Sequence, residues 1–367
     1  QLMKDNNPSD KVTNTKATNA KLITALQARA SLYQTIRDFF AKKGVLEVET
    51  PILSSSATTD VHLASVLAYR HMGGKRACHY SQTSPEFAMK RLLACGTGAI
   101  YQICKVFRDD EHSDRHNSEF TMLEWYRPDF SLDDLMAEVS DLVALCLGRP
   151  LLIQKLSYKH AFFAKLGIDP LLADIGVLKQ KAYDYGLASD LGDDRLAYVD
   201  FLFAVAVEPE LGKMALNATA NLAGNDVDSD KANGVKKDSS QDHAQTAISA
   251  VFLTDFPKEL ASLAKVHKDS DEMVVSARFE LYIDGLELAN GYDELADSKV
   301  LYERFLADNK QREQLGLPIM PIDEKLLAVI DAIPSCAGVA LGIDRLLMVQ
   351  AKTKMIADVL SFTAFDA

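Results

Sequence analysis

Residues 107–127 read FRDDEHSDRHNSEFTMLEWYR and place a charged loop between two apolar segments. The pattern predicts a strand over residues 99–107, a loop, and a second strand over residues 119–127. A strand alternates its side chains between two faces, and one face of the second strand collects Phe120, Met122, Glu124 and Tyr126. Burying a carboxylate there is costly without a partner. Glu124 is therefore either part of a ligand site or a residue at the sheet margin that pairs with a lysine such as Lys105.

Helical and strand patterns surround this pair of strands. Before it, residues 21–43 carry apolar residues at helical spacing, and Gly44 is expected to cap the helix. A strand over residues 45–49 follows and must stop before Pro51, which lacks an amide hydrogen. Other helices are expected over residues 85–94, 131–147, 298–315 and 323–333, and other strands over residues 251–254, 272–289 and 338–341. The helices would flank the sheet.

The composition is ordinary for a soluble globular protein. The chain has 367 residues, of which 48% are hydrophobic and 25% charged, enough for one large domain or two smaller ones. Its net charge of -12 opposes a broad surface for nucleic acid. The five cysteines show no CxxC spacing, which indicates neither a disulfide framework nor a zinc site. Since no apolar stretch could span a bilayer and the polar start is unlike a signal peptide, we expect a cytoplasmic protein.

Two segments differ in composition from the rest of the chain. Residues 1–18 are polar and are interpreted as an N-terminal extension of a domain over residues 19–367. Residues 221–247 contain no Phe, Tyr or Trp and are rich in Gly, Asn, Asp, Ser and Lys. Such a segment buries too little apolar surface to offset the entropy that ordering removes. We expect it to be a mobile insertion in that domain.

Residues 279–288, FELYIDGLEL, predict a β-hairpin, because an Asp-Gly pair between alternating residues is typical of a two-residue turn. With this turn, one face collects Glu280, Tyr282 and Glu287. Glu280 and Glu287 are then diagonal neighbours, about 7–8 Å apart at the backbone, which suits two oxygen donors to Mg2+. A solvated outer face of the sheet would give the same pattern.

Residues 338–345, GVALGIDR, place small residues at alternate positions of a predicted strand and end with Arg345 at the start of a helix. The small residues would let a ligand approach the strand closely. An arginine at a helix start suits a phosphate. A tight packing contact between the strand and the helix would also require small residues.

In chain order, three stretches resemble the three signature motifs of class II aminoacyl-tRNA synthetases. They are the long helix with the strand that ends at Pro51, residues 107–127, and residues 338–345. The resemblance implies an α+β fold with a central antiparallel sheet flanked by helices. The helix and the Pro51 turn form the dimer interface in class II enzymes, so a homodimer is also implied.

Within that superfamily, the chain most resembles the lysine-specific members. The matching stretches are TSPE at 83–86, RHN at 115–117, FTMLE at 120–124 and NGYDEL at 290–295. The resemblance is strongest to the elongation factor P beta-lysyltransferase family, which are paralogues of lysyl-tRNA synthetase. The stretches that carry it are LEWYRP at 123–128, GLELANG at 285–291 and CAGVALG at 336–342.

The resemblance implies roles in binding ATP and Mg2+. Arg108 would neutralise the α-phosphate and the substrate carboxylate, so that one anion can attack another, and Arg345 would be catalytic with it. His116 and Arg345 would hold the outer phosphates, and Phe120 would stack on adenine. The implied ATP-binding residues are Arg108, Asp110, Arg115, His116, Asn117, Phe120, Glu280 and Arg345. The implied metal ligands are Glu280 and Glu287.

The resemblance also implies an amino-acid pocket. Glu86 would bind the backbone-type amino group, and Tyr292 would lie along the methylenes. The distal ammonium would be surrounded by Glu124, Tyr126, Asn290 and Glu294. The full implied set is Glu86, Arg108, Glu124, Tyr126, Asn290, Tyr292, Glu294, Ala340 and Gly342. Buried carboxylates that face a dication are what selectivity for lysine requires.

Strand parity conflicts with one part of that pocket. Glu287 falls on the opposite parity from Asn290, Tyr292 and Glu294. We therefore predict a bulge near Gly291 that brings these residues to the ligand face.

Two positions depart from the patterns of related families. Asp110 stands where the family usually has a glutamate that reaches the adenine amino group, so this contact is a methylene shorter or passes to Glu111. Ala340 stands where lysyl-tRNA synthetases tend to have glycine, and it matches the elongation factor P enzymes. The added methyl group would shift which lysine isomer fits.

Three functions compete. The leading hypothesis is activation of lysine, preferably (R)-beta-lysine, as its adenylate and transfer to the side-chain amine of a lysine on elongation factor P. The first rival is a lysyl-tRNA synthetase fragment that aminoacylates tRNA. The acidic net charge opposes it, as does the short segment of about 27 residues before the first motif, too few for an anticodon-binding barrel. The second rival is a non-catalytic lysine-sensing paralogue, which has no need of residues such as Arg108 and Arg345 that hold phosphates.

Overall fold

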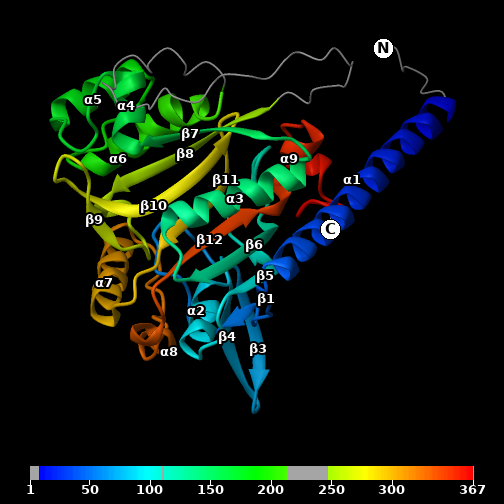
Figure 1. The fold of residues 1–367 in the computed structure, drawn as a ribbon, viewed down its shortest axis with the longest axis horizontal. Helices are drawn as coiled ribbons and strands as arrows, with labels where there is room; N and C mark the ends of the chain where they lie inside the picture. Colours follow the sequence, from blue (N-terminus) through cyan, green and yellow to red (C-terminus); the bar gives the residue numbers. More distant parts are fainter. Residues whose placement is uncertain (1–7, 110, 214–246, 367) are drawn as a thin grey trace, which may run out of the picture. The chain divides into compact units, whose positions relative to one another are not determined.

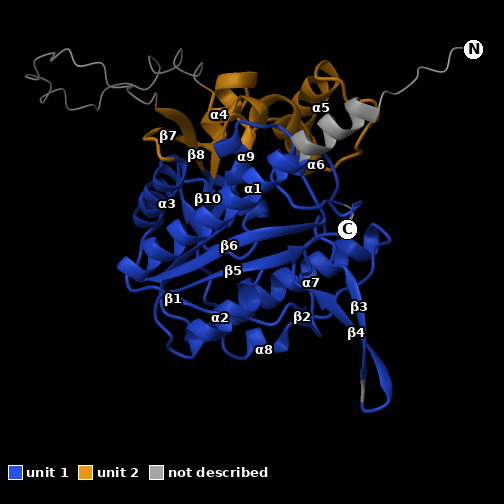
Figure 2. Cartoon of the chain, turned by 90° about the vertical axis from the view of Figure 1, so that its right-hand side faces the viewer, with its two compact units in different colours: residues 1–147, 254–280, 287–367 blue, residues 148–253, 281–286 orange. Residues whose placement is uncertain are grey.

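The computed structural model describes residues 8–109, 111–213 and 247–366. Asp110, residues 221–246 of the predicted insertion and residues 1–7 of the predicted extension lie outside the described residues. The chain forms two compact units (Figure 2): unit 1 comprises residues 1–147, 254–280 and 287–367, and unit 2 comprises residues 148–253 and 281–286. Within the described ranges, no helix is both long and apolar enough to cross a membrane.

The sheet of unit 1 confirms the predicted α+β class (Figure 1). Its strands lie in the order β1-β5-β6-β12-β11-β10, and β9 pairs with β10. The pairs β5–β6, β6–β12 and β12–β11 are antiparallel, as predicted, whereas β1–β5 is parallel. The bounds are β1 (Leu46–Glu47), β5 (Ile100–Phe107), β6 (Glu119–Pro128), β9 (Val266–Lys268), β10 (Val274–Ile283), β11 (Leu286–Asp293) and β12 (Cys336–Gly342).

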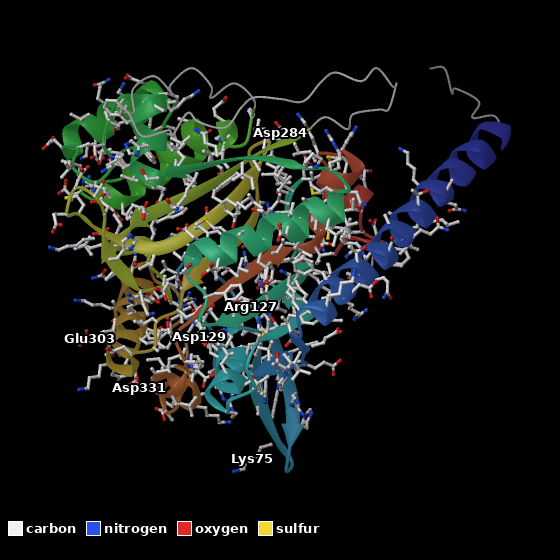
Figure 3. The ribbon with its side chains drawn as sticks, viewed as in Figure 1. Lys75, Arg127, Asp129, Asp284, Glu303 and Asp331 are labelled. Atoms are coloured by element: carbon white, nitrogen blue, oxygen red, sulfur yellow. The ribbon has the colours of Figure 1, made fainter. Side chains whose placement is uncertain are left out.

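A second, three-stranded sheet lies in the same unit. Its order is β2-β4-β3, with β2 (Leu53–Ser54), β3 (Leu67–Met72) and β4 (Lys75–Ser81). Lys75 lies at the tip of the β3–β4 hairpin (Figure 3). None of these three strands is among the elements expected from the sequence.

Helices pack on both faces of the larger sheet. On one face, α3 packs on β12 and α9 on β6, while Phe40 of α1 stacks on Tyr101 of β5 with ring centroids 4.4 Å apart. On the other face, α2, α7 and α8 share a core with Tyr126 of β6. The bounds are α1 (Pro8–Lys42), α2 (Glu86–Ala94), α3 (Leu132–Leu147), α7 (Ser298–Gln314), α8 (Glu324–Leu327) and α9 (Ile343–Ala351), with 3-10 turns at Lys258–Leu260, Ile330–Ala332 and Ile356–Asp358.

Two helix predictions needed correction. The first helix begins at Pro8 rather than at residue 21, inside the segment interpreted as a polar extension. The helix predicted over residues 323–333 is instead the short α8 followed by a 3-10 turn. The predicted cap is present, since Gly44 has a φ of +68° and the Val45 amide donates to the Phe40 carbonyl at 3.0 Å.

Unit 2 has its own aromatic core. Tyr158 and Phe203 stack with centroids 5.1 Å apart, and Phe203 meets Tyr282 edge-on. The predicted Asp-Gly turn closes the hairpin tip, with φ values of 52° at Asp284 and 66° at Gly285. The bounds are β7 (Leu151–Ser157), α4 (Tyr158–Leu166), α5 (Ile175–Asp184), α6 (Arg195–Leu202), a π-helical turn at Phe203–Val207, a 3-10 turn at Glu208–Glu210, and β8 (Ile248–Pro257), whose last residues belong to unit 1.

The carboxylate of Asp344 joins three elements of unit 1. Asp344 lies in the first turn of α9 and is only 2% exposed. Its Oδ2 accepts from the Thr121 amide of β6 at 2.7 Å, and its Oδ1 accepts from Arg29 of α1. Arg29 also donates to the carbonyl of Val359 at 2.9 Å. A buried carboxylate is tolerated only with such partners, so this ion pair fixes α1, β6 and α9 relative to one another.

We expect Arg29→Met to lower the free energy of unfolding by about 3 kcal/mol, because the variant leaves the buried carboxylate of Asp344 without its cation. The matched control is Arg37→Met on the same helix, which removes an exposed pair with Glu47 and should cost less than about 1 kcal/mol. Urea unfolding followed by circular dichroism gives both values. Equal losses in the two variants would contradict the role given to Arg29.

Candidate active site

A cavity of about 970 Å³ opens within unit 1. Its lining includes every described residue that the sequence singled out as a candidate: Glu86, Arg108, Arg115, His116, Asn117, Phe120, Glu124, Tyr126, Glu280, Glu287, Asn290, Tyr292, Glu294, Ala340, Gly342 and Arg345. Asp110 lies outside the described residues. Residues from α2, β6, β10, β11, β12 and the loop after β5 thus meet around one space.

Strand register explains why three neighbouring strands present this lining together. Ala340 of β12 lies opposite Glu124 on one side and Asn290 on the other. Gly338 likewise lies between Tyr126 and Tyr292. A methyl group on Gly338 would come within 2.3 Å of Glu294 Oε1 and 2.4 Å of the Tyr126 ring. The small residues of β12 therefore make room for the pocket's own side chains.

The predicted bulge near Gly291 does not interrupt the ladder with β12, which is regular from Ala289 to Asp293. The outcome that it was meant to explain is present, since Asn290, Tyr292 and Glu294 line the cavity together with Glu287. The Phe279 ring covers Gly291, and Arg278 Nε donates to Asn290 Oδ1 at 3.1 Å. Residues of the same parity therefore share a face here, whereas a two-residue turn alone pairs residues of opposite parity. The change of face lies between the turn and Asn290.

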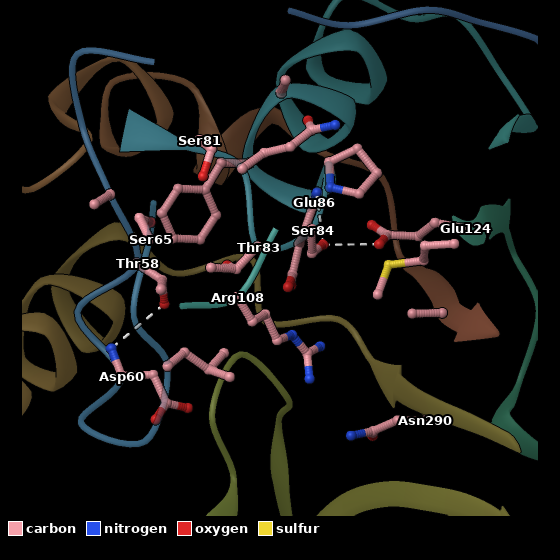
Figure 4. Close-up of a pocket in the computed structure, with 18 of the residues that line it drawn as sticks. Thr58, Asp60, Ser65, Ser81, Thr83, Ser84, Glu86, Arg108, Glu124 and Asn290 are labelled. Carbon is pink, nitrogen blue, oxygen red and sulfur yellow. Dashed lines mark hydrogen bonds between the residues drawn. The ribbon is translucent and has the colours of Figure 1, made fainter. Parts of the chain in front are cut away.

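Glu124 has hydroxyl partners rather than a lysine. Its Oε1 accepts from Tyr126 at 2.7 Å and its Oε2 accepts from Ser84 at 2.8 Å, the second of which is drawn in Figure 4. Lys105 pairs with Glu119 instead, at 3.3 Å. Burial and then repulsion from Glu86 raise the pKa of Glu124 to about 8, against the two hydrogen bonds. Glu124 is therefore a buried carboxyl group that a cation in the cavity would ionise.

A lysine bridges the other two carboxylates at this end of the cavity. Lys90 of α2 is fully buried, and its Nζ lies 2.7 Å from Glu86 Oε1 and 2.6 Å from Glu294 Oε2. Burial alone lowers the pKa of Lys90, but attraction to Glu294 and Glu86 outweighs it and leaves the pKa above its usual value. The ammonium is therefore charged. The three carboxylates form the acidic end of the cavity.

Arg345 and His116 form the opposite, basic end. Arg345 Nη2 lies 2.7 Å from His116 Nε2, and its Nη1 donates to the Glu287 carbonyl at 2.8 Å and to Glu287 Oε2 at 3.2 Å. Because arginine only donates, Nε2 of His116 must be the acceptor, and Nδ1 carries the proton toward Ser113 Oγ at 2.7 Å. Burial and the charge of Arg345 lower the pKa of His116. His116 is thus a neutral ring that orients Arg345.

Arg108 lines the same cavity. Figure 4 shows its guanidinium pointing into open space between Glu124 and Asn290. Its Nη1 lies 3.5 Å from Glu111 Oε1, and its Cζ lies 5.1 Å from the centroid of the Phe120 ring. Its buried Nε has no hydrogen-bond partner among the described residues. An unsatisfied donor of a charged group is costly, and an anionic ligand would satisfy it.

The remaining candidates already have partners in the chain. Glu280 pairs with Arg278. The amide of Asn117 donates to the Glu119 carbonyl at 2.6 Å, and its oxygen accepts from the Ala364 amide at 3.0 Å. Asn117 therefore ties the loop to the C-terminal segment.

The overall sequence agrees with this geometry. Residues 11–366 match the family described as tRNA synthetases class II (D, K and N). This chain belongs to that class II synthetase family. Proteins named "Elongation factor P--(R)-beta-lysine ligase" are 42% identical in Avibacterium paragallinarum, 41% in Mannheimia succiniciproducens and 40% in Haemophilus influenzae strain PittGG. Each alignment covers 94% of this chain and 96–97% of the relative.

Three polar residues of this class II synthetase site were missed by sequence reasoning. Lys90 follows Glu86 by one helical turn, and that i,i+4 spacing could have indicated a pair. Arg278 precedes Glu280 by two residues on one strand face, which is a comparable signal. Ser84 has no signal of this kind, because its bond to Glu124 depends on how α2 packs on β6.

The arrangement can hold a molecule that carries opposite charges at its two ends. The basic end offers Arg345 to phosphate groups, and the acidic end offers Glu124 to an ammonium group. Arg108 lies where two anionic groups could meet and be neutralised together. This is the charge distribution that activation of a cationic amino acid by ATP requires.

Proposed function

We propose that this chain is an AMP-forming ligase that activates (R)-beta-lysine, or lysine, with ATP and transfers it to a lysine side chain of elongation factor P. The observation that carries the proposal is that Arg108, with an unsatisfied buried donor, lines one cavity together with the acidic Glu124 and the basic Arg345. The names of relatives about 41% identical to the chain supply the acceptor and the isomer. Such a role is consistent with a cytoplasmic protein.

Arg108 and Arg345 act on ATP in this proposal. The substrate carboxylate attacks the α-phosphorus, pyrophosphate leaves, and Arg108 offsets the charge of both anions. Arg345, oriented by His116, holds the outer phosphates, with Arg115 and Asn117 close to them, and Phe120 stacks on adenine. Asp110 or Glu111 would contact the adenine amino group. The carboxylate is already ionised, so this step needs no general base.

Mg2+ fits the carboxylates of Glu280 and Glu287. Among the described residues, no group of three metal-ligating side chains exists. Mg2+ bound to a nucleotide, however, often takes only one or two carboxylates besides phosphate oxygens. Glu280 pairs with Arg278, and Glu287 with Arg345, so each carboxylate would exchange an arginine for the metal. Mg2+ would there offset phosphate charge.

The acidic end selects the amino acid. Glu124 with Tyr126, and Glu294, would receive the distal ammonium, and Glu86 would receive the other amino group. Asn290 and Tyr292 would lie along the chain of the amino acid. Ala340 and Gly342 would form the floor on β12, where the methyl of Ala340 lies between Glu124 and Asn290 and limits the isomer that fits.

Transfer then joins the activated amino acid to the acceptor. The neutral amine of the acceptor lysine attacks the adenylate carbonyl, an amide forms, and AMP leaves. A lysine has a pKa of about 10.4 in water and must lose a proton before it attacks. The proposal assigns this whole reaction to one catalytic domain over residues 19–367, with residues 1–18 as an extension and residues 221–247 as an insertion.

Pyrophosphate exchange tests the proposal. With ATP and Mg2+, the chain should exchange labelled pyrophosphate into ATP in the presence of (R)-beta-lysine or lysine, and not with norleucine, which lacks the distal ammonium. Labelled amino acid should then pass to elongation factor P and not to lysine tRNA. Exchange with neither isomer would refute both enzyme hypotheses and leave the lysine sensor. Transfer to tRNA alone would identify a lysyl-tRNA synthetase.

We also propose a homodimer, since α1 and the segment after it expose large apolar side chains: Ile23, Leu26, Leu46 and Ile52. Exposed apolar groups on one element are typical of an interface between subunits. Sedimentation at micromolar concentration should give twice the chain mass of 40.4 kDa. A monomer at that concentration would contradict the proposal.

The pKa of Glu124 predicts how amino-acid binding depends on pH. At neutral pH the carboxyl group holds a proton in the empty cavity, because its pKa is raised to about 8. An ammonium ligand requires the ionised form, so the KM for the amino acid should fall about tenfold per pH unit from about pH 6 to 8 and then level off. Exchange kinetics over this range measure it. In Glu124→Gln the KM should be higher and should depend less steeply on pH, since only Glu294, whose pKa is also raised to about 8, still titrates in this range. A flat wild-type profile would refute the assignment.

A further inference from the structure

Lys90 holds a buried charge that the proposed reaction does not use. Its Nζ lies between Glu86 Oε1 and Glu294 Oε2, at 2.7 and 2.6 Å, and the side chain is 0% exposed. Glu86 and Glu294 line the cavity, whereas Lys90 is not part of its lining. The ammonium therefore contacts the wall of the site from behind.

We propose that Lys90 is a positioning residue that sets the charge of the amino-acid pocket, as the fixed counter-ion of Glu86 and Glu294. Three carboxylates (Glu86, Glu124 and Glu294) and one ammonium leave a net charge of -2 when all are ionised. Two substrate ammonium groups neutralise that charge. The inference rests on the proposed function, because it assumes a diamino acid in the cavity.

The ion pairs also fix which carboxylate oxygens the cavity can use. Lys90 occupies Oε2 of Glu294, while Oε1 lies over Gly338, where an added methyl group would come within 2.3 Å of it. Both carboxylate oxygens of Glu294 thus have a neighbour in the chain, and the carboxylate presents one defined edge to the cavity. On α2, Lys90 likewise fixes Oε1 of Glu86. Without Lys90, both side chains would lose the contact that sets their rotamers.

Fold stability does not by itself require a charge at this position. A buried ion pair is often no more stabilising than apolar side chains of similar volume. The acidic cavity does require one, because a buried carboxylate without a cation takes up a proton. A protonated carboxylic acid cannot pair with an ammonium as a carboxylate does. Burial raises the pKa of Glu294 to about 8, and Lys90 lowers it against that effect, so Lys90 favours the ionised form that the substrate needs.

The titratable groups that face this cluster come from several elements: Glu86 on α2, Cys104 on β5, Glu124 and Tyr126 on β6, Lys265 before β9, Tyr292 and Asp293 on β11, Glu294 directly after β11, and Cys336 on β12. Burial raises the pKa of Cys104 and of Cys336 to about 12, and burial raises that of Tyr126 well above its usual value. These three groups stay neutral near pH 7. Changes in proton uptake there belong to the carboxyl groups.

Lys90→Met tests the inference by kinetics. At pH 7 the KM for (R)-beta-lysine in pyrophosphate exchange should rise about tenfold or more, and kcat should change by less than about threefold. The pH above which the KM levels off should be higher than in wild type, since the carboxyl group of Glu294 loses the cation that lowers its pKa. A merely structural lysine would change stability and leave this pH unchanged.

The matched control is Lys265→Met. Lys265 pairs with Asp293 at 2.7 Å, next to Glu294 in sequence, but the pair is more than a third exposed and outside the cavity lining. In Lys265→Met, the KM for (R)-beta-lysine and its dependence on pH should equal those of wild type. Normal binding of ATP by Lys90→Met shows that the variant is folded. If this folded variant keeps the wild-type KM and the wild-type dependence of the KM on pH, the inference is wrong. If the methionine variant does not fold, Lys90→Gln, which retains a neutral donor, replaces it in the same test.

Proton counting adds a second readout. Calorimetry of (R)-beta-lysine binding at pH 8, repeated in buffers of different ionisation enthalpy, counts the protons released by wild type and by Lys90→Met. The variant should release more protons than wild type, because Glu294 without its cation holds its proton to higher pH. Equal release would overturn the inference. Absence of exchange in wild type would instead refute the proposed function, so the two failures are distinguishable.

Discussion

The structure of unit 1 depends on one buried carboxylate, that of Asp344. It accepts from Arg29 of the first helix and from the Thr121 amide of the central strand β6, and it lies in the first turn of α9 beside Arg345. Three stretches that are far apart in the chain are therefore fixed through one group. Because Arg345 is the next residue, the same bond holds the basic end of the cavity in place.

Basic and acidic side chains lie in different parts of the cavity. At one end, His116 accepts from Arg345 and fixes the direction of its guanidinium. At the other end, hydroxyl groups satisfy Glu124, whereas Lys90 satisfies Glu86 and Glu294. These two kinds of partner have different consequences. Hydroxyl groups leave Glu124 open to protonation, whereas the internal cation Lys90 lowers the pKa of Glu294 against the effect of burial. A dicationic amino acid meets both kinds of carboxylate.

Much of the fold was predictable because its signals are local. Parity placed Met122, Glu124 and Tyr126 on one face of β6, and an Asp-Gly pair placed the hairpin turn. The β2-β4-β3 sheet was missed because its strands carry little apolar alternation. The change of face in the hairpin was placed too late, near Gly291, since register away from a turn depends on cross-strand packing that one strand does not encode.

The site was predictable as a set of residues but less so as a set of contacts. Every described candidate lines the cavity, since the motifs that carry them lie on neighbouring strands. The partners were not foreseen: Lys105 was one of two alternatives for Glu124, which instead accepts from Ser84, and Asn117 bonds to backbone groups. Such contacts depend on how α2 and the C-terminal segment pack.

A crystal structure with a stable lysyl-adenylate mimic, 5′-O-(N-lysylsulfamoyl)adenosine, tests the account most directly. The account predicts the sulfamoyl group within hydrogen-bond distance of Arg108, the adenine ring on Phe120 and the distal ammonium beside Glu124. Binding of the mimic outside this cavity, or with its ammonium group away from Glu124 and Glu294, would contradict it.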